Sequence, residues 1–145
     1  MLEIYKETQE QELAIEHFVG LVESYWAENI EEKHLTYDKL AVEVKLKNVH
    51  TGKLLSLNNL SSGEKQMISI FARLYLNPQV RYIILIDEPE LSLSIEWQKK
   101  FLVDVFSSDS CAQLVAITHS PYIFENELDE YAGSLGVSFR QDSSI

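Results

Sequence analysis

The chain has 145 residues, which is enough for one domain with a sizeable core, and its composition of 46% hydrophobic and 24% charged residues is typical of a globular protein. Its 23 acidic residues outnumber its 12 basic residues, so the formal net charge is −11. This balance argues against a broad phosphate-binding face in this segment, because such a face needs clustered Lys and Arg side chains.

The cysteine content and the apolar segments indicate where the protein works. The chain contains one cysteine, Cys111, which excludes an internal disulfide and fits a reducing compartment. The N-terminus has no apolar core of signal-peptide length, and no stretch of the sequence is long enough to span a bilayer. We therefore expect a cytoplasmic protein without membrane contact.

The first predicted element is a helix from about Thr8 to Glu32, within a helical N-terminal segment at residues 1–34. Apolar residues recur in it at spacings of three to five, and glutamates fall mostly between them. This pattern predicts a helix with one apolar face.

An antiparallel hairpin is predicted next. Residues 40–47 alternate apolar and charged side chains, which indicates a half-exposed strand. Residues 48–52 read as a turn, and residues 53–57 return as the second strand.

A second helix is predicted from about Ser62 to Leu76, and Pro78 sets its end. Four residues form its apolar face: Met67, Ile70, Phe71 and Leu74. The core of the domain is expected on that side of the helix.

The last elements form a βαβ unit. Residues 82–86 are continuously apolar, as expected of a strand buried on both faces, and residues 113–118 form a second buried strand. The helix at residues 95–106 connects them, so the two strands are expected to be parallel. Five residues are expected on the inner side of this helix: Gln98, Phe101, Leu102, Val105 and Phe106. The polar tail at residues 138–145 is expected to be frayed.

The string LSSGEKQ at residues 60–66 opens the second helix and has two interpretations. In the structural one, Ser61 and Glu64 form a capping box. In the functional one, the free N–H groups and the positive end of the helix dipole bind an anion, and Gly63 allows a close backbone approach. Both interpretations can hold at once.

Asp87 and Glu88 follow the first buried strand, and His119 directly follows the second. The carboxyl ends of parallel strands are where α/β sheets bind ligands. A carboxylate there can hold Mg²⁺, and its neighbour can activate a water molecule. The alternatives are a solvated acidic turn before Pro89 and a structural or surface histidine.

Together these three motifs resemble the signature motif, Walker B strand and switch histidine of an ABC-type ATPase domain. Their order and spacing are those of the RecF-, SMC- and OLD-like (AAA_21-type) branch. The resemblance covers residues from about 35 to 130, and it implies one lobe at residues 35–137. The implied fold is α/β: the C-terminal lobe of a P-loop NTPase, with a parallel sheet flanked by helices and a small antiparallel hairpin.

The resemblance also implies roles for the strand-end residues. Asp87 takes the metal-binding role, Glu88 acts as the catalytic base, and His119 senses the γ-phosphate. The residues that follow match the D-loop of the family: Glu90, Leu91 and Ser92. Ser94 is either part of that loop or a helix N-cap.

In the family, the signature serine contacts ATP held by the other protomer, and Ser61 matches it. The resemblance therefore places a nucleotide-binding segment in trans at Ser61, Ser62, Gly63 and Glu64. Ser62 and Glu64 depart from the transporter pattern, and both departures suit the RecF- and OLD-like branch. The N-terminal helix is either the last part of the helical arm of such domains or a simple packing helix.

The phosphate-cradling string Gly-x-x-x-x-Gly-Lys-Ser/Thr occurs nowhere in these 145 residues. The resemblance thus implies the second half of a domain that binds ATP and Mg²⁺ only with a Walker A-bearing half or subunit. The complete protein is then a homo-oligomeric, ATP-dependent dimer switch in DNA handling or bacterial defence, with DNA or an effector protein as partner. The alternative is a non-catalytic interaction module, a split-gene subunit or a truncated fragment, that cannot bind ATP alone.

The strand at residues 113–118 lacks the neighbour that the Walker A strand provides in this fold. We predict that the lobe self-associates through this edge, swaps elements, or covers the edge with its own N-terminal helix or tail. The alternative is that a short strand at residues 2–5 folds back and pairs there.

Overall fold

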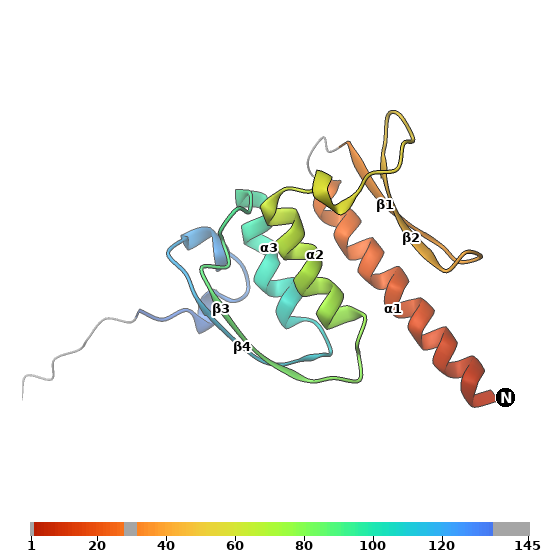
Figure 1. Cartoon of the computed structure of the whole chain (residues 1–145). Helices are drawn as coiled ribbons and strands as arrows, with labels where there is room; N and C mark the ends of the chain where they lie inside the picture. The colour runs from red at the N-terminus through yellow and green to blue at the C-terminus, as the bar shows by residue number, and fades with distance from the viewer. Residues whose placement is uncertain (1, 28–31, 135–145) are drawn as a thin grey trace, which may run out of the picture.

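The computed structural model describes residues 2–27 and 32–134, so the tail predicted at residues 138–145 lies outside the described residues. Helix α1 and the β1–β2 hairpin lie on one side of the molecule, the β3–β4 pair lies on the other, and α2 and α3 lie between them (Figure 1). The elements in chain order are α1 (Leu2–Trp26), β1 (Lys33–Asp38), β2 (Glu43–Asn48), η1 (Leu57–Asn59), α2 (Ser62–Tyr75), β3 (Tyr82–Asp87), α3 (Ile95–Phe106), β4 (Cys111–Ile117), η2 (Pro121–Ile123) and η3 (Asp129–Tyr131).

Helix α1 is displaced from its predicted range, because it begins at Leu2 rather than Thr8 and ends at Trp26 rather than Glu32. Its first residues include Glu3 and Lys6, which favour helix, and no Gly or Pro interrupts them. The alternative of a strand at residues 2–5 is therefore wrong. Among the residues that the structure describes, no helix combines the length and apolar character needed to cross a membrane.

The predicted antiparallel hairpin exists, but its two strands were wrongly paired. Strand β1 pairs with β2, with Leu35 opposite Leu46, whereas residues 53–57 contribute only an isolated bridge between Lys47 and Leu54. The turn that the sequence analysis missed is built on Asp38, whose carboxylate accepts hydrogen bonds from the backbone N–H groups of Leu40 and Ala41, each at 3.1 Å. Such Asx turns reverse the chain without Gly or Pro.

Helices α2 and α3 occur where they were predicted. Their apolar faces enclose Phe71 and Phe101, which are fully buried between them. Tyr25 ties α1 to this pair: its hydroxyl donates to Asp104 Oδ2 at 2.6 Å, and its carbonyl accepts from Trp97 Nε1 at 2.8 Å. The central core is thus an aromatic cluster shared by three helices.

One residue of α3 was placed on the wrong side. Phe106, expected on the inner face, is 51% exposed at the helix end. The buried stripe runs through Trp97, Phe101 and Val105, at helical spacing, and Phe106 lies about 100° around the helix from its end.

The βαβ unit is confirmed, since β3 and β4 are parallel and pair Leu85 with Val115. The expected burial of β3 on both faces is wrong, because Ile83 and Leu85 are 69% and 74% exposed. The sheet has only two strands within the described part of the chain. Its inner face, which includes Ile84 and Ile86, packs on the core, and its outer face is uncovered.

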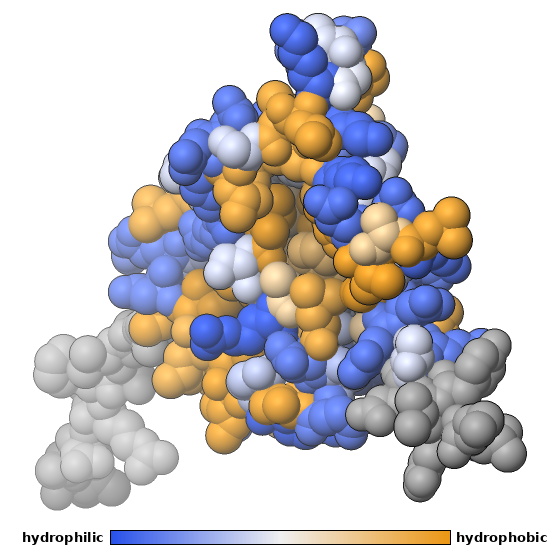
Figure 2. Space-filling model, turned by 45° about the vertical axis from the view of Figure 1, so that its right-hand side comes forward, coloured by the Kyte–Doolittle hydropathy of each residue, from blue (hydrophilic) through white to orange (hydrophobic). Residues whose placement is uncertain are grey.

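Apolar side chains are exposed elsewhere too. On the face shown in Figure 2 they gather around a central hollow, and hydrophilic residues border them. Large contiguous apolar surfaces of this kind usually mark contacts with other proteins.

Strand β4 is paired only along its β3 side within the described residues. Helix α1 packs against α2 and β1, so the expectation that the N-terminal helix covers the edge of β4 is wrong. Self-association through this edge stays a prediction.

We expect the chain to associate in a concentration-dependent manner through β4, because the unpaired N–H and C=O groups of an apolar edge recruit another strand. Val115→Lys places a charge in the middle of this strand and should give a monomer in analytical ultracentrifugation. Val49→Lys, in the exposed turn after β2, is the matched control. A wild-type chain that is monomeric at every concentration, or a Val115→Lys variant that still associates, would contradict the prediction.

Candidate functional site

The strand-end residues singled out in the sequence lie at one edge of the β3–β4 sheet. Asp87 ends β3 and pairs with Ile117, and the N–H of Glu88 donates to the Ile117 carbonyl at 2.8 Å. His119 follows two residues later, with its side chain in solvent like that of Asp87. The parallel pairing therefore brings the predicted metal-binding, basic and phosphate-sensing segments together.

The turn that follows β3, residues 88–93, has an unusual backbone. Glu88 and Ser92 have φ values of 49° and 63°, in the left-handed region that non-glycine residues rarely adopt. Pro89 is fully buried and Leu93 is buried, so both ends of the turn are held by the core. Left-handed non-glycine residues concentrate at functional sites, where the surrounding structure offsets their strain.

The start of α2 is a capping box, as its structural interpretation required. Ser61 Oγ accepts from the Glu64 N–H at 3.2 Å, and the Ser61 N–H donates to Glu64 Oε2 at 2.5 Å. The side chains of Ser61 and Ser62 are exposed. The N-terminus of α2 therefore remains accessible to a ligand or a second protomer.

Glu64 is only 2% exposed, and its carboxylate is already occupied. Lys33 Nζ lies 2.8 Å from each of its oxygens, in addition to the bond from the Ser61 N–H. Burial by itself raises the pKa of Glu64, but the hydrogen bonds from Lys33 and Ser61 outweigh it and hold that pKa below its usual value. Lys33, which the sequence analysis assigned no role, thus ties β1 to the start of α2.

Gly63 lies against the turn after β3. A Cβ atom at Gly63 would come within 2.0 Å of the Ser92 carbonyl oxygen, so no larger residue fits without movement of the backbone. The close approach that was predicted for a phosphate is made here by Ser92 of the same chain. The signature segment and the D-loop segment are therefore in direct contact.

Glu90 connects the turn to the loop after β4. Its carboxylate accepts from Thr118 Oγ1 at 2.6 Å and from the His119 N–H at 2.8 Å. Partial burial raises the pKa of Glu90, yet these hydrogen bonds hold it below its usual value. Leu91, the next D-loop residue, is 56% exposed.

The inner residue Gln98 of α3 holds the same two loops from behind. Its Nε2 donates to the Leu93 carbonyl at 3.0 Å, and its Oε1 accepts from Ser120 Oγ at 2.6 Å. The sequence analysis placed Gln98 on the inner face of α3 without a reason, and a polar residue there is the signal that points to these contacts. Ser94 is the N-cap of α3, where its Oγ accepts from the Trp97 N–H.

Asp87 is suited to hold a cation together with a nucleotide. Within residues 2–27 and 32–134, no three His, Cys, Asp or Glu side chains are arranged to hold a metal ion. Mg²⁺ in phosphate-processing sites commonly takes one or two carboxylates, with substrate phosphates and water as its other ligands. One exposed carboxylate at the sheet edge fits that donor set.

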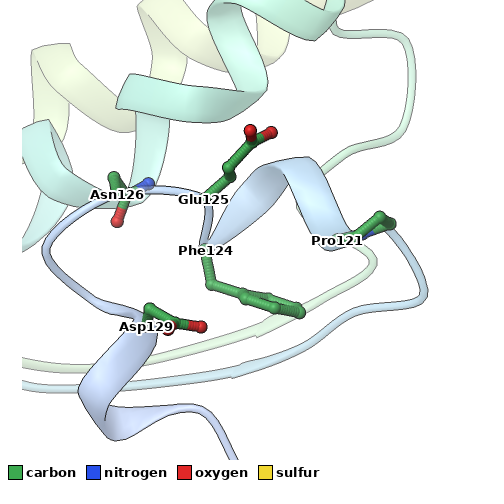
Figure 3. Close-up of a pocket in the computed structure, with 5 residues that line it drawn as sticks. All are labelled: Pro121, Phe124, Glu125, Asn126 and Asp129. Atoms are coloured by element: carbon green, nitrogen blue, oxygen red, sulfur yellow. The ribbon is translucent and has the colours of Figure 1, made fainter.

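A shallow pocket of about 340 Å³ lies away from these residues, in the segment after η2, and Figure 3 shows the five residues that line it: Pro121, Phe124, Glu125, Asn126 and Asp129. Asn126 uses its side-chain amide to hold the loop, since Nδ2 donates to the carbonyls of Lys99 and Ile123 at 2.6 and 3.2 Å. The pocket contains none of the predicted site residues, and we assign it no role.

Removal of the Lys33 ammonium is expected to destabilise the chain, because it leaves the Glu64 carboxylate buried with fewer donors. Lys33→Met should lower the free energy of unfolding by about 1–3 kcal/mol near neutral pH, measured by urea denaturation. The pKa of Glu64 lies below its usual 4.5 in the folded state, so this stabilisation is present above that pH and is lost as the pH falls through the folded pKa.

The difference between Lys33→Met and the wild type should therefore shrink in acid. Lys53→Met, in the exposed segment after β2, is the control and should change stability by less than about 0.5 kcal/mol. A Lys33→Met effect that is the same at neutral pH and below the Glu64 pKa would count against the ion pair as its cause.

A family model described as "AAA domain, putative AbiEii toxin, Type IV TA system" matches residues 9–125. The match spans α1 to η2 and includes all three motif segments. A search of curated proteins found no match. Since the matched residues make up most of the chain, and since the sheet edge carries the expected carboxylates and histidine, the chain belongs to this family of AAA-type, P-loop nucleotide-binding domains.

Proposed function

We propose that this chain is the C-terminal lobe of an ABC-type ATPase domain of the RecF-, SMC- and OLD-like branch. The observation that carries the proposal is the register of β3 and β4, which places Asp87 and Glu88 beside the segment that carries His119. The family match supports nucleotide binding in general. The contact between Gly63 and Ser92 supports a shared site, because it joins the signature and D-loop segments.

Each strand-end residue has a chemical task in this proposal. Asp87 would hold Mg²⁺, which offsets phosphate charge when it is bound. Glu88 would accept the proton of the attacking water, and its left-handed backbone aims it differently from a residue of the strand. His119, exposed at the sheet edge, would donate a hydrogen bond to a γ-phosphate oxygen.

The N-terminus of α2 would act on the nucleotide of a second protomer. Ser61 and Ser62 are exposed at the positive end of a 14-residue helix, where anions bind favourably. The Ser61 oxygen accepts within the capping box, but its O–H remains available as a donor. Glu64 would support this segment from beneath rather than touch the nucleotide, since Lys33 and Ser61 occupy its carboxylate.

A Walker A-bearing half, in cis or as a separate subunit, would complete the site. Parallel sheets are normally covered on both faces, whereas Ile83 and Leu85 are exposed on the outer face of this one. Val115 lies beside Leu85, and both are apolar, so the uncovered surface is continuous across the two strands. This face and the free edge of β4 are where we place the missing half.

The complete protein would then work as an ATP-dependent homodimer switch. Closure around two nucleotides and opening after hydrolysis would regulate DNA handling or an effector protein, with bacterial defence as the proposed setting. The acidic balance of this lobe argues that any DNA contact lies elsewhere in the protein.

A second candidate is a non-catalytic interaction module: a split-gene subunit or a truncated fragment. The absence of a Gly-x-x-x-x-Gly-Lys-Ser/Thr string from the 145 residues favours it, as does the exposed apolar face, which suits protein binding without chemistry. The two candidates differ in what happens once a Walker A half is added.

The isolated chain should not bind Mg-ATP with micromolar affinity, because the glycine-rich loop and lysine that cradle phosphates are absent from it. Calorimetric titration of the whole chain measures this. A clear micromolar isotherm would reveal a nucleotide site outside the proposed one.

With a Walker A half supplied, Glu88→Gln should leave ATP binding intact and slow hydrolysis by roughly 10²-fold or more, as expected when a general base is lost. Glu96→Gln, an exposed carboxylate in the first turn of α3, is the matched control and should keep normal turnover. Turnover of Glu88→Gln within about twofold of wild type would remove Glu88 from this role. A wild-type complemented domain that hydrolyses no ATP would favour the interaction module.

A further inference from the structure

The turn between β3 and α3 contains a carboxylate that the proposed reaction leaves without a task. Glu90 lies two residues after the proposed base and carries neither metal nor proton in the scheme. Both of its oxygens nevertheless accept hydrogen bonds, and both donors belong to the loop after β4.

The two donors are consecutive residues. Thr118 Oγ1 donates to Oε2 at 2.6 Å, and the backbone N–H of His119 donates to Oε1 at 2.8 Å. Thr118 Oγ1 in turn accepts from the Ser120 N–H at 3.0 Å. One carboxylate therefore holds the backbone from which the His119 side chain extends.

The other end of the connection is equally firm. Glu90 lies inside the turn whose ends are buried at Pro89 and Leu93. The same turn presents the Ser92 carbonyl to Gly63. A shift of the turn would therefore be felt at the start of α2 and, through the Glu90 carboxylate, at His119.

We propose that Glu90 is a positioning residue that fixes the His119 backbone relative to Asp87 and Glu88. The proposal rests on the proposed function only for its catalytic consequence; the positioning itself is a property of the chain alone. Charge-assisted hydrogen bonds from an O–H and an N–H to one carboxylate are short and directional, which suits this task.

A carboxylate that merely stabilised the turn would make a different prediction. Its removal would lower global stability and leave the His119 backbone no more mobile than its surroundings. A positioning carboxylate instead ties its own protonation to the His119 N–H, because a protonated oxygen is a weaker acceptor.

The chain alone provides the first test, by NMR of the uniformly ¹⁵N-labelled protein. In the wild type, the amide signals of Thr118 and His119 should titrate together with a midpoint below the usual carboxyl value of 4.5. This titration should vanish in Glu90→Gln. Hydrogen exchange at the His119 amide should be about tenfold faster or more in Glu90→Ala, while the amide of Val22 in the core of α1 keeps its protection.

Glu96→Gln is the control, because it removes a nearby exposed charge and should change neither signal. An unchanged His119 exchange rate in folded Glu90→Ala overturns the proposal. If Glu90→Ala does not fold, the wild-type titration decides: a His119 amide that does not follow a low-pH carboxyl overturns it as well.

The complemented domain provides the second test. Glu90→Gln should lower kcat by about 10- to 100-fold through misplacement of His119, with KM for ATP nearly unchanged. A normal kcat in an active domain overturns the catalytic consequence. A wild-type complemented domain without activity instead refutes the proposed function, and the NMR result still decides the positioning.

Discussion

The parallel pairing of β3 with β4 is the interaction on which the rest of the structure depends. Pairing of Asp87 with Ile117 brings two loops, from residues about thirty apart in the chain, to one sheet edge. Helix α3 must cross between the strands, so its apolar face is carried onto the same core as α2. A shift of one residue in this register would turn every side chain of one strand to the opposite face and separate the candidate site residues.

The helices hold this edge in place through a small number of polar contacts inside an apolar core. Tyr25 ties α1 to α3, and Lys33 ties β1 to Glu64 at the start of α2. Such contacts are costly to break one-sidedly, because a buried acceptor is then left without its donor. The start of α2 is therefore held by the core, by the hairpin and by the turn at Ser92, and the accessible groups there are the two serine side chains.

The same pairing also explains what the chain leaves open. A two-stranded parallel sheet can be covered on one face by the two helices that accompany it, and here α2 and α3 use the inner face. Ile83 and Leu85 remain in solvent, although their residue types are those of a buried strand. A sequence that reads as buried and a surface that is exposed are reconciled if another half or subunit covers the sheet, as the proposed function requires.

Local pattern alone determined α2, α3 and both core strands, because apolar periodicity, the Ser61 and Ser94 caps and the continuous apolar runs act within a few residues. It also placed Asp87, Glu88 and His119 at strand ends. Tertiary structure decided the rest: the pairing of β1 with β2, the exposure of Ile83, the contact of Gly63 with Ser92, and the partners of Glu64 and Glu90. Each of these joins residues distant in the chain or depends on what covers a surface, and periodicity carries no information about either.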